Sequence, residues 1–150
     1  WAFIPAYTLF CVSGALFLAN GAVLRPLAVA AVAATVLAAA ADYLETIMLL
    51  AITSDLDRAE PLLAYSQLGA WAKFALLAAH ALFCAGLCYL SPRRRPFLGL
   101  ALVMPTVGVA AAAYDHTALA NVMNATFALA WLSLFALALK DAVQAKDERA

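Results

Sequence analysis

Charged residues are scarce in this sequence. Asp, Glu, Lys and Arg together make up 12% of its 150 residues, about half of the ~25% that is typical of soluble domains. So few charged side chains cannot form the polar shell that a soluble fold of this size needs. The formal net charge is zero, so no bulk field attracts nucleic acid, and nucleic acid is not an expected partner.

Cysteine and histidine are also rare. Cys11, Cys84 and Cys88 form an odd set within apolar segments, which does not fit a disulfide framework. The two histidines, His80 and His116, lie on different segments without a dense ligand motif. We therefore predict no metal site, and the sequence identifies no cofactor.

Apolar residues make up most of the chain. They account for 67% of the sequence, and the mean hydropathy is +0.93. A helix crosses a hydrocarbon core ~30 Å thick with ~20 apolar residues, and an open sheet would leave backbone groups unpaired in lipid. The sequence therefore predicts one all-α domain over residues 1–150, a polytopic membrane bundle of about five helices that span residues 3–19, 27–52, 67–90, 97–113 and 117–139.

The positions of Lys and Arg predict the orientation of this bundle. With five spans, the segments after the first and third spans share a side with the C-terminal tail. Positive residues mark the cytoplasmic side, so we expect the C-terminus in the cytoplasm and the N-terminus outside, in a cell inner (plasma) membrane. The predicted inner side carries Arg25, Arg93, Arg94, Arg95, Lys140, Lys146 and Arg149, whereas Arg58 alone lies on the other side.

Ionisable residues on the second and third spans are candidates for a site, because burying a charge in a membrane is costly without a partner. Asp42 and Glu45 lie three residues apart and share one helix face, and Lys73 and His80 lie seven apart on another. The two spans are antiparallel neighbours. Matching depths below their predicted outer ends predicts two pairs, Glu45 with Lys73 and Asp42 with His80.

Further polar residues fall at the same predicted depth on the last span. Asn121 and Asn124 follow one face of it, and Asp115 and His116 lie in the turn just outside. We interpret these groups as one outward-facing polar pocket. The candidate acid, base or anchoring groups are Asp42, Glu45 and His80, and the candidate ligand-binding groups are Lys73, Asn121, Asn124, Asp115 and His116.

This pocket favours binding of a small lipophilic or lipid ligand, with or without processing of that ligand, and membrane lipids are expected partners. One alternative is an accessory or assembly subunit of a larger membrane complex, in which the buried charges are assembly contacts. Another is a membrane-embedded hydrolase, metal-dependent or acid/base, that uses the carboxylates and His80. Whether the protein is an enzyme stays open, since no hydrolase motif is present. Polar residues can also serve only as contacts between helices.

In size and number of spans, the chain resembles the tryptophan-rich sensory or translocator protein family. The three tryptophans of this sequence, Trp1, Trp71 and Trp131, lie far apart. The resemblance therefore implies no site residue and no ligand. No motif in the sequence is specific enough to identify another family.

Overall fold

The computed structural model is built from five α-helices, and it describes residues 2–19, 24–56, 59–92 and 94–147. The described residues contain no strand, so the predicted all-α class with five helices is confirmed. The helices are α1 (Phe3–Leu18), α2 (Arg25–Ser54), α3 (Ala59–Leu90), α4 (Pro96–Tyr114) and α5 (His116–Asp147).

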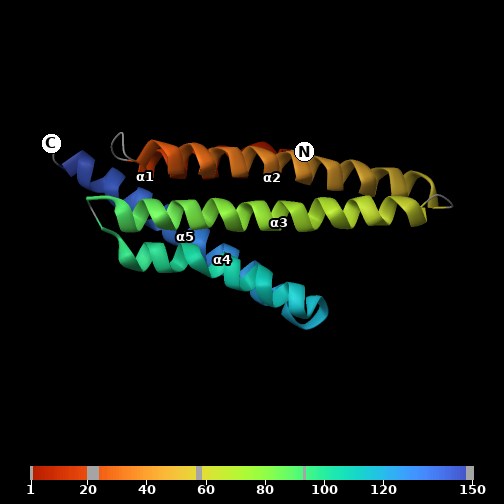
Figure 1. The fold of residues 1–150 in the computed structure, drawn as a ribbon. Coiled ribbons are helices and arrows are strands. Elements are labelled where there is room, and N and C mark those ends of the chain that lie inside the picture. Colours follow the sequence, from red (N-terminus) through yellow and green to blue (C-terminus); the bar gives the residue numbers. More distant parts are fainter. Residues whose placement is uncertain (1, 20–23, 57–58, 93, 148–150) are drawn as a thin grey trace.

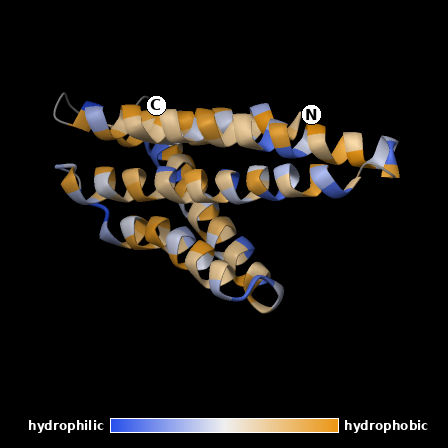
Figure 2. Ribbon diagram, turned by 45° about the vertical axis from the view of Figure 1, so that its right-hand side comes forward, coloured by the Kyte–Doolittle hydropathy of each residue, from blue (hydrophilic) through white to orange (hydrophobic). Residues whose placement is uncertain are grey.

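Four of these helices, α2 to α5, are long and apolar enough to cross a membrane. The first helix, α1, is apolar but has 16 residues, which span about 24 Å. The helix bodies are mostly apolar, and many of the hydrophilic residues lie near turns and helix ends (Figure 2). The structure thus has the architecture of a helical membrane bundle.

The long helices form two hairpins, α2 with α3 and α4 with α5 (Figure 1). The hairpins lie together at the end where α3 passes to α4 and diverge toward their opposite ends. The short helix α1 packs against α2 and α3. Side chains from all five helices, among them Ala15, Ala31, Leu87, Leu102 and Leu134, form a common core.

Two helix boundaries differ from the prediction in a way that affects the site. The structure extends α2 to Ser54 and starts α3 at Ala59, whereas the sequence predicted that the second span ends at residue 52 and the third begins at residue 67. Pro61 and the acidic Glu60 both fall in the first turn of α3, where proline costs no backbone bond and a carboxylate complements the helix dipole. The connection is therefore short, and α3 begins about two turns earlier than predicted.

The close contact between α2 and α3 requires a glycine. A Cβ atom on Gly69 would lie 3.0 Å from the carbonyl oxygen of Ala41 and 3.0 Å from the backbone nitrogen of Glu45. Both neighbours are backbone atoms, which cannot rotate away. Gly69 thus sets the distance between the two helices beside the charged residues of α2.

Arg95, just before α4, contacts both α5 and α1 where the hairpins meet. Arg95 forms an ion pair with Asp141, with 2.9 Å between Nη2 and Oδ2, and its guanidinium lies 5.4 Å from the centre of the Phe17 ring. The predicted charge asymmetry also includes Arg58, Arg93, Arg149 and the side chain of Lys146, which lie outside the described residues. The orientation across the membrane stays a prediction.

Gly69→Ala should separate α2 from α3. We expect the free energy of unfolding to fall by about 1–3 kcal/mol, because the added methyl group overpacks a backbone contact. The matched control on the same helix is Gly86→Ala, whose Cβ would meet only the Cδ1 of Leu27 at an ordinary 3.5 Å. Chemical unfolding in mild detergent, followed by circular dichroism, measures both variants. Equal stability of the two would contradict the close approach.

Candidate functional site

Three charged side chains of α2 and α3 form one cluster. The ammonium of Lys73 lies 3.1 Å from Oδ1 of Asp42 and 2.5 Å from Oε2 of Glu45. Their side chains keep only 16%, 12% and 20% of their possible exposure, in the order Lys73, Asp42 and Glu45. The predicted pair of Glu45 with Lys73 is confirmed, and Asp42 joins it because both carboxylates share one face of α2.

The predicted pair of Asp42 with His80 is wrong. Nδ1 of His80 lies 2.9 Å from Oγ1 of Thr35 and 3.1 Å from the carbonyl oxygen of Ala31. Lys73 and His80 lie seven residues apart on α3, about 10 Å along its axis, whereas Asp42 and Glu45 lie only three apart on α2, about 4–5 Å. One antiparallel register therefore cannot form both predicted pairs. His80 therefore lies opposite Thr35, two turns away from Asp42 on α2, while the long side chain of Lys73 still reaches both carboxylates.

The contacts of His80 are satisfied within the bundle. Besides the contacts of Nδ1, Sγ of Cys84 lies 3.5 Å from Nε2. A neutral ring that carries its proton on Nδ1 fits all of these contacts, because Nδ1–H then donates and Nε2 accepts from the thiol. The residue is only 3% exposed. His80 thus links α3 to α2 in the middle of the bundle.

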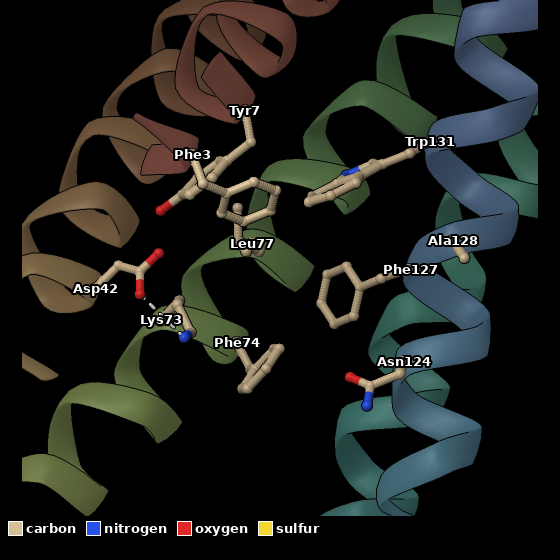
Figure 3. A pocket seen from close by; sticks show the side chains of 10 residues that line it. All are labelled: Phe3, Tyr7, Asp42, Lys73, Phe74, Leu77, Asn124, Phe127, Ala128 and Trp131. Atoms are coloured by element: carbon tan, nitrogen blue, oxygen red, sulfur yellow. Dashed lines mark hydrogen bonds and ion pairs between the residues drawn. The ribbon is translucent and has the colours of Figure 1, made fainter. Parts of the chain in front are cut away.

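A cavity of about 250 Å³ lies beside the charged cluster (Figure 3). Residues from α1, α2, α3 and α5 form its walls, so it occupies the space that the hairpins leave between them. Asp42 and Lys73 lie at one side, facing α5 across the cavity. The lining residues are Phe3, Tyr7, Asp42, Lys73, Phe74, Leu77, Asn124, Phe127, Ala128 and Trp131.

Aromatic rings make up much of the cavity wall, and each ring contacts the next across three helices. Tyr7 of α1 stacks on Trp131 of α5 with ring centres 6.2 Å apart. Trp131 in turn meets Phe127, and Phe127 meets Phe74 of α3 at 5.8 Å. Such contacts each add roughly 0.5–1.5 kcal/mol beyond area burial. The rings therefore hold α1, α5 and α3 around the cavity.

The hydroxyl of Tyr7 is an unpartnered polar group in this wall. The residue is only 5% exposed, and its hydroxyl has no hydrogen-bond partner among the described residues. The oxygen points toward the carboxylate of Asp42 (Figure 3). A buried hydroxyl without a partner costs about 1–3 kcal/mol. Its position marks where a polar atom of a ligand would be stabilised.

An apolar hollow of about 280 Å³ continues the cavity between α1 and α5. Both spaces share Phe3, Tyr7 and Trp131. The hollow is lined in addition by Phe10, Leu132 and Phe135, of which Leu132 and Phe135 are well exposed. The charged cluster is therefore connected to the outer apolar surface of the bundle by an aromatic path.

The structure brings only part of the predicted site together. Asn124 lines the cavity with Asp42 and Lys73. Asn121 is exposed and His80 is buried elsewhere, so neither lines it. His116, the first residue of α5, does not line it either, and the centre of its ring lies 5.8 Å from that of Trp71.

The role of Asp115 is visible in its hydrogen bonds. Its Oδ1 accepts from the backbone N–H groups of Thr117 and Ala118 and from the hydroxyl of Thr117. This is the N-cap arrangement that satisfies the free N–H groups at a helix start. Asp115 thus begins α5 and does not line the cavity.

Residues of the aromatic wall were missing from the predicted site. Phe3 and Tyr7 lie four residues apart on α1, and Phe127 and Trp131 lie four apart on α5. This spacing places both members of each pair on one helix face. The sequence therefore shows the spacing of these aromatic residues. Aromatic side chains that face lipid have the same spacing, so only the packing of the helices distinguishes a cavity wall from a lipid-facing surface.

The described residues contain no group of three or more His, Cys, Asp or Glu placed to hold a metal ion. The three cysteines are buried and free. Comparison of the chain with family models, with curated proteins and with solved structures finds no match.

Lys73→Met should destabilise the bundle, because it leaves Asp42 and Glu45 without their cation. Removal of one partner from a fully buried pair costs about 3–5 kcal/mol, and the partial exposure here reduces the expected loss to about 2 kcal/mol. Chemical unfolding in detergent measures it. The triple variant that adds Asp42→Asn and Glu45→Gln should recover most of the loss. An unaltered stability of Lys73→Met would show that the cluster is not formed.

Asp115 makes the start of α5 sensitive to pH. Hydrogen bonds from the backbone N–H of Ala118 and from Thr117 hold the pKa of this carboxyl below its usual range. Because the folded-state pKa is lowered, the stabilisation is fully present above the unfolded value of about 3.9 and is lost as the pH falls through the folded value.

The thermal unfolding midpoint tests this cap across the acidic range. Asp115→Asn should keep a cap but lose this part of the pH dependence, since asparagine caps as well as aspartate. Asp115→Ala should lower the midpoint already at neutral pH. Parallel pH profiles for the wild type and Asp115→Asn would show that the carboxylate does not cap α5.

Proposed function

We propose that this protein binds a small lipophilic ligand in the cavity between α1, α3 and α5. The observation that carries the proposal is the buried hydroxyl of Tyr7, which has no partner in the described chain and points at Asp42 inside the cavity. A folded protein rarely leaves such a group without a partner. A ligand with a polar end would supply one, and its apolar part would contact the aromatic wall.

The path between α1 and α5 supports a ligand that arrives from the lipid. It is lined by apolar side chains, so an amphiphile can enter without crossing a polar barrier. Asp42 lies 17 residues after Arg25 on α2, about 25 Å along the helix axis. If Arg25 marks one face of a hydrocarbon core ~30 Å thick, the charged end of the cavity lies close to the opposite face.

The charge pattern of the helix ends supports an outward-facing site. The end with Arg25 and Arg95 would face the cytoplasm of a cell inner membrane under the positive-inside rule. The cavity then opens toward the outer leaflet, and membrane lipids surround its entrance. The polar end of the ligand would rest near the headgroup level while its apolar part stays within the hydrocarbon layer.

Binding is favoured over hydrolysis by the position of His80. Both nitrogens of its ring already have partners, which are Thr35, Ala31 and Cys84. The residue does not line the cavity. The cavity lining contains no Ser, Thr or Cys among the described residues. A carboxylate without a positioned imidazole or nucleophile is suited to anchoring a ligand rather than to acyl transfer.

Filling the cavity tests this proposal. Ala128 lines it, and Ala136 lies two turns further along α5 on the exposed surface. The protein is released gently from its own membrane, and native mass spectrometry records its non-covalent companions. Wild type and Ala136→Phe should retain a small-molecule adduct that Ala128→Phe loses.

Two results would contradict the proposal. An adduct that Ala128→Phe keeps in full would place the ligand elsewhere. Recovery of the wild type without any small molecule, but with other polypeptides at fixed stoichiometry, would make the chain a subunit whose buried charges serve assembly.

A further inference from the structure

We infer that the ligand of this cavity is a lipophilic amine that carries one positive charge. The inference rests on the proposed function and names the chemical class of its ligand. Three features of the cavity lead to it: the balance of charge in the cluster beside it, the aromatic wall, and the unpartnered hydroxyl of Tyr7. Each feature comes from a different helix or set of atoms.

The charged cluster is one cation short of neutrality. Two carboxylates, Asp42 and Glu45, share the single ammonium of Lys73. Among the described residues that line the cavity, Lys73 is the only cationic side chain. The apolar and aromatic walls lower the local dielectric, which strengthens the field of this surplus negative charge. The field favours a ligand with one positive charge and disfavours an anion.

The aromatic wall is suited to the same ligand. The faces of aromatic rings carry negative potential and attract cations, and the attraction grows when the cation is desolvated. Lys73 already shows this arrangement, with its ammonium 5.0 Å from the centre of the Phe74 ring. Tyr7, Phe127 and Trp131 present further rings to the cavity. An ammonium that enters therefore exchanges water for ring faces and a carboxylate.

The hydroxyl of Tyr7 indicates a ligand that donates hydrogen bonds. It is directed toward the carboxylate of Asp42 without lying within hydrogen-bond distance of it, and the lone pairs of its oxygen are free to accept. A protonated amine between these groups donates to the carboxylate and to the hydroxyl at once, and charge-assisted bonds of this kind are the strong ones. The amide of Asn124 across the cavity offers a further acceptor.

The charge is tested with three phenyl compounds of similar size: 2-phenylethylammonium, the neutral 2-phenylethanol and the anion 3-phenylpropanoate. Equilibrium dialysis of each radiolabelled compound against the full chain in phosphatidylglycerol nanodiscs, with empty discs subtracted, measures binding. The ammonium should bind at least about tenfold more tightly than the alcohol, and the anion should not bind. Asp42→Asn should remove the preference for the ammonium while binding of the alcohol is retained.

The outcomes separate the ligand class from the proposed function. Equal binding of ammonium and alcohol would overturn the inference and leave the binding cavity in place, as would tighter binding of the anion. Failure of all three to bind would overturn both. Asn121→Ala, on α5 outside the cavity, is the control that should keep the full preference.

A positively charged amine is found both on free small molecules and on lipid headgroups. A second dialysis experiment distinguishes these two sources. The dialysis is repeated in nanodiscs that contain phosphatidylethanolamine. Loss of 2-phenylethylammonium binding would identify the lipid headgroup as the source, because the lipid then occupies the site. Unchanged binding would identify a free amine. Tyr7→Phe should weaken binding of the ammonium in the phosphatidylglycerol discs, since it removes the hydroxyl alone.

Discussion

The antiparallel contact between α2 and α3 determines the position of every charge inside this bundle. The two helices approach so closely at Gly69 that a single methyl group would meet the backbone of α2. A contact of this kind allows one register, because sliding by a turn would bring larger side chains into the gap. In that register Lys73 lies between Asp42 and Glu45, and His80 lies against Thr35.

Two kinds of polar contact arise from this register, and they differ in consequence. Around His80, donors and acceptors are matched and the residue is almost fully buried. This contact joins two helices and leaves no polar atom of the ring without a partner. Around Lys73, two acidic groups share one cation beside a cavity. Buried ion pairs add little net stability, because desolvation offsets attraction. The surplus charge of this arrangement is what the proposed ligand would neutralise.

The sequence predicted the helical class, the number of helices and the pair of Glu45 with Lys73, because long apolar runs and buried charges obey strong constraints. It misplaced His80 because approximate depths do not fix the register of two helices: His80 lies seven residues from Lys73, whereas Asp42 lies only three from Glu45. It missed Tyr7 because nothing in the sequence shows that α1 packs across the cavity from α5. Helix boundaries and contacts between distant helices depend on packing, which one sequence does not display.

The distance from the Lys73 ammonium to the carboxyl carbons of Asp42 and Glu45 is the most direct measure of the register between α2 and α3. Solid-state NMR measures it in lipid bilayers, through dipolar coupling between ¹⁵N-labelled lysine and ¹³C-labelled carboxyl groups, and the carbon shifts report ionisation. We expect the ammonium to contact both carboxylates, as in the structure. Contact with only one of them, or with neither, would contradict the register of α2 and α3 and the charge of the site that depends on it.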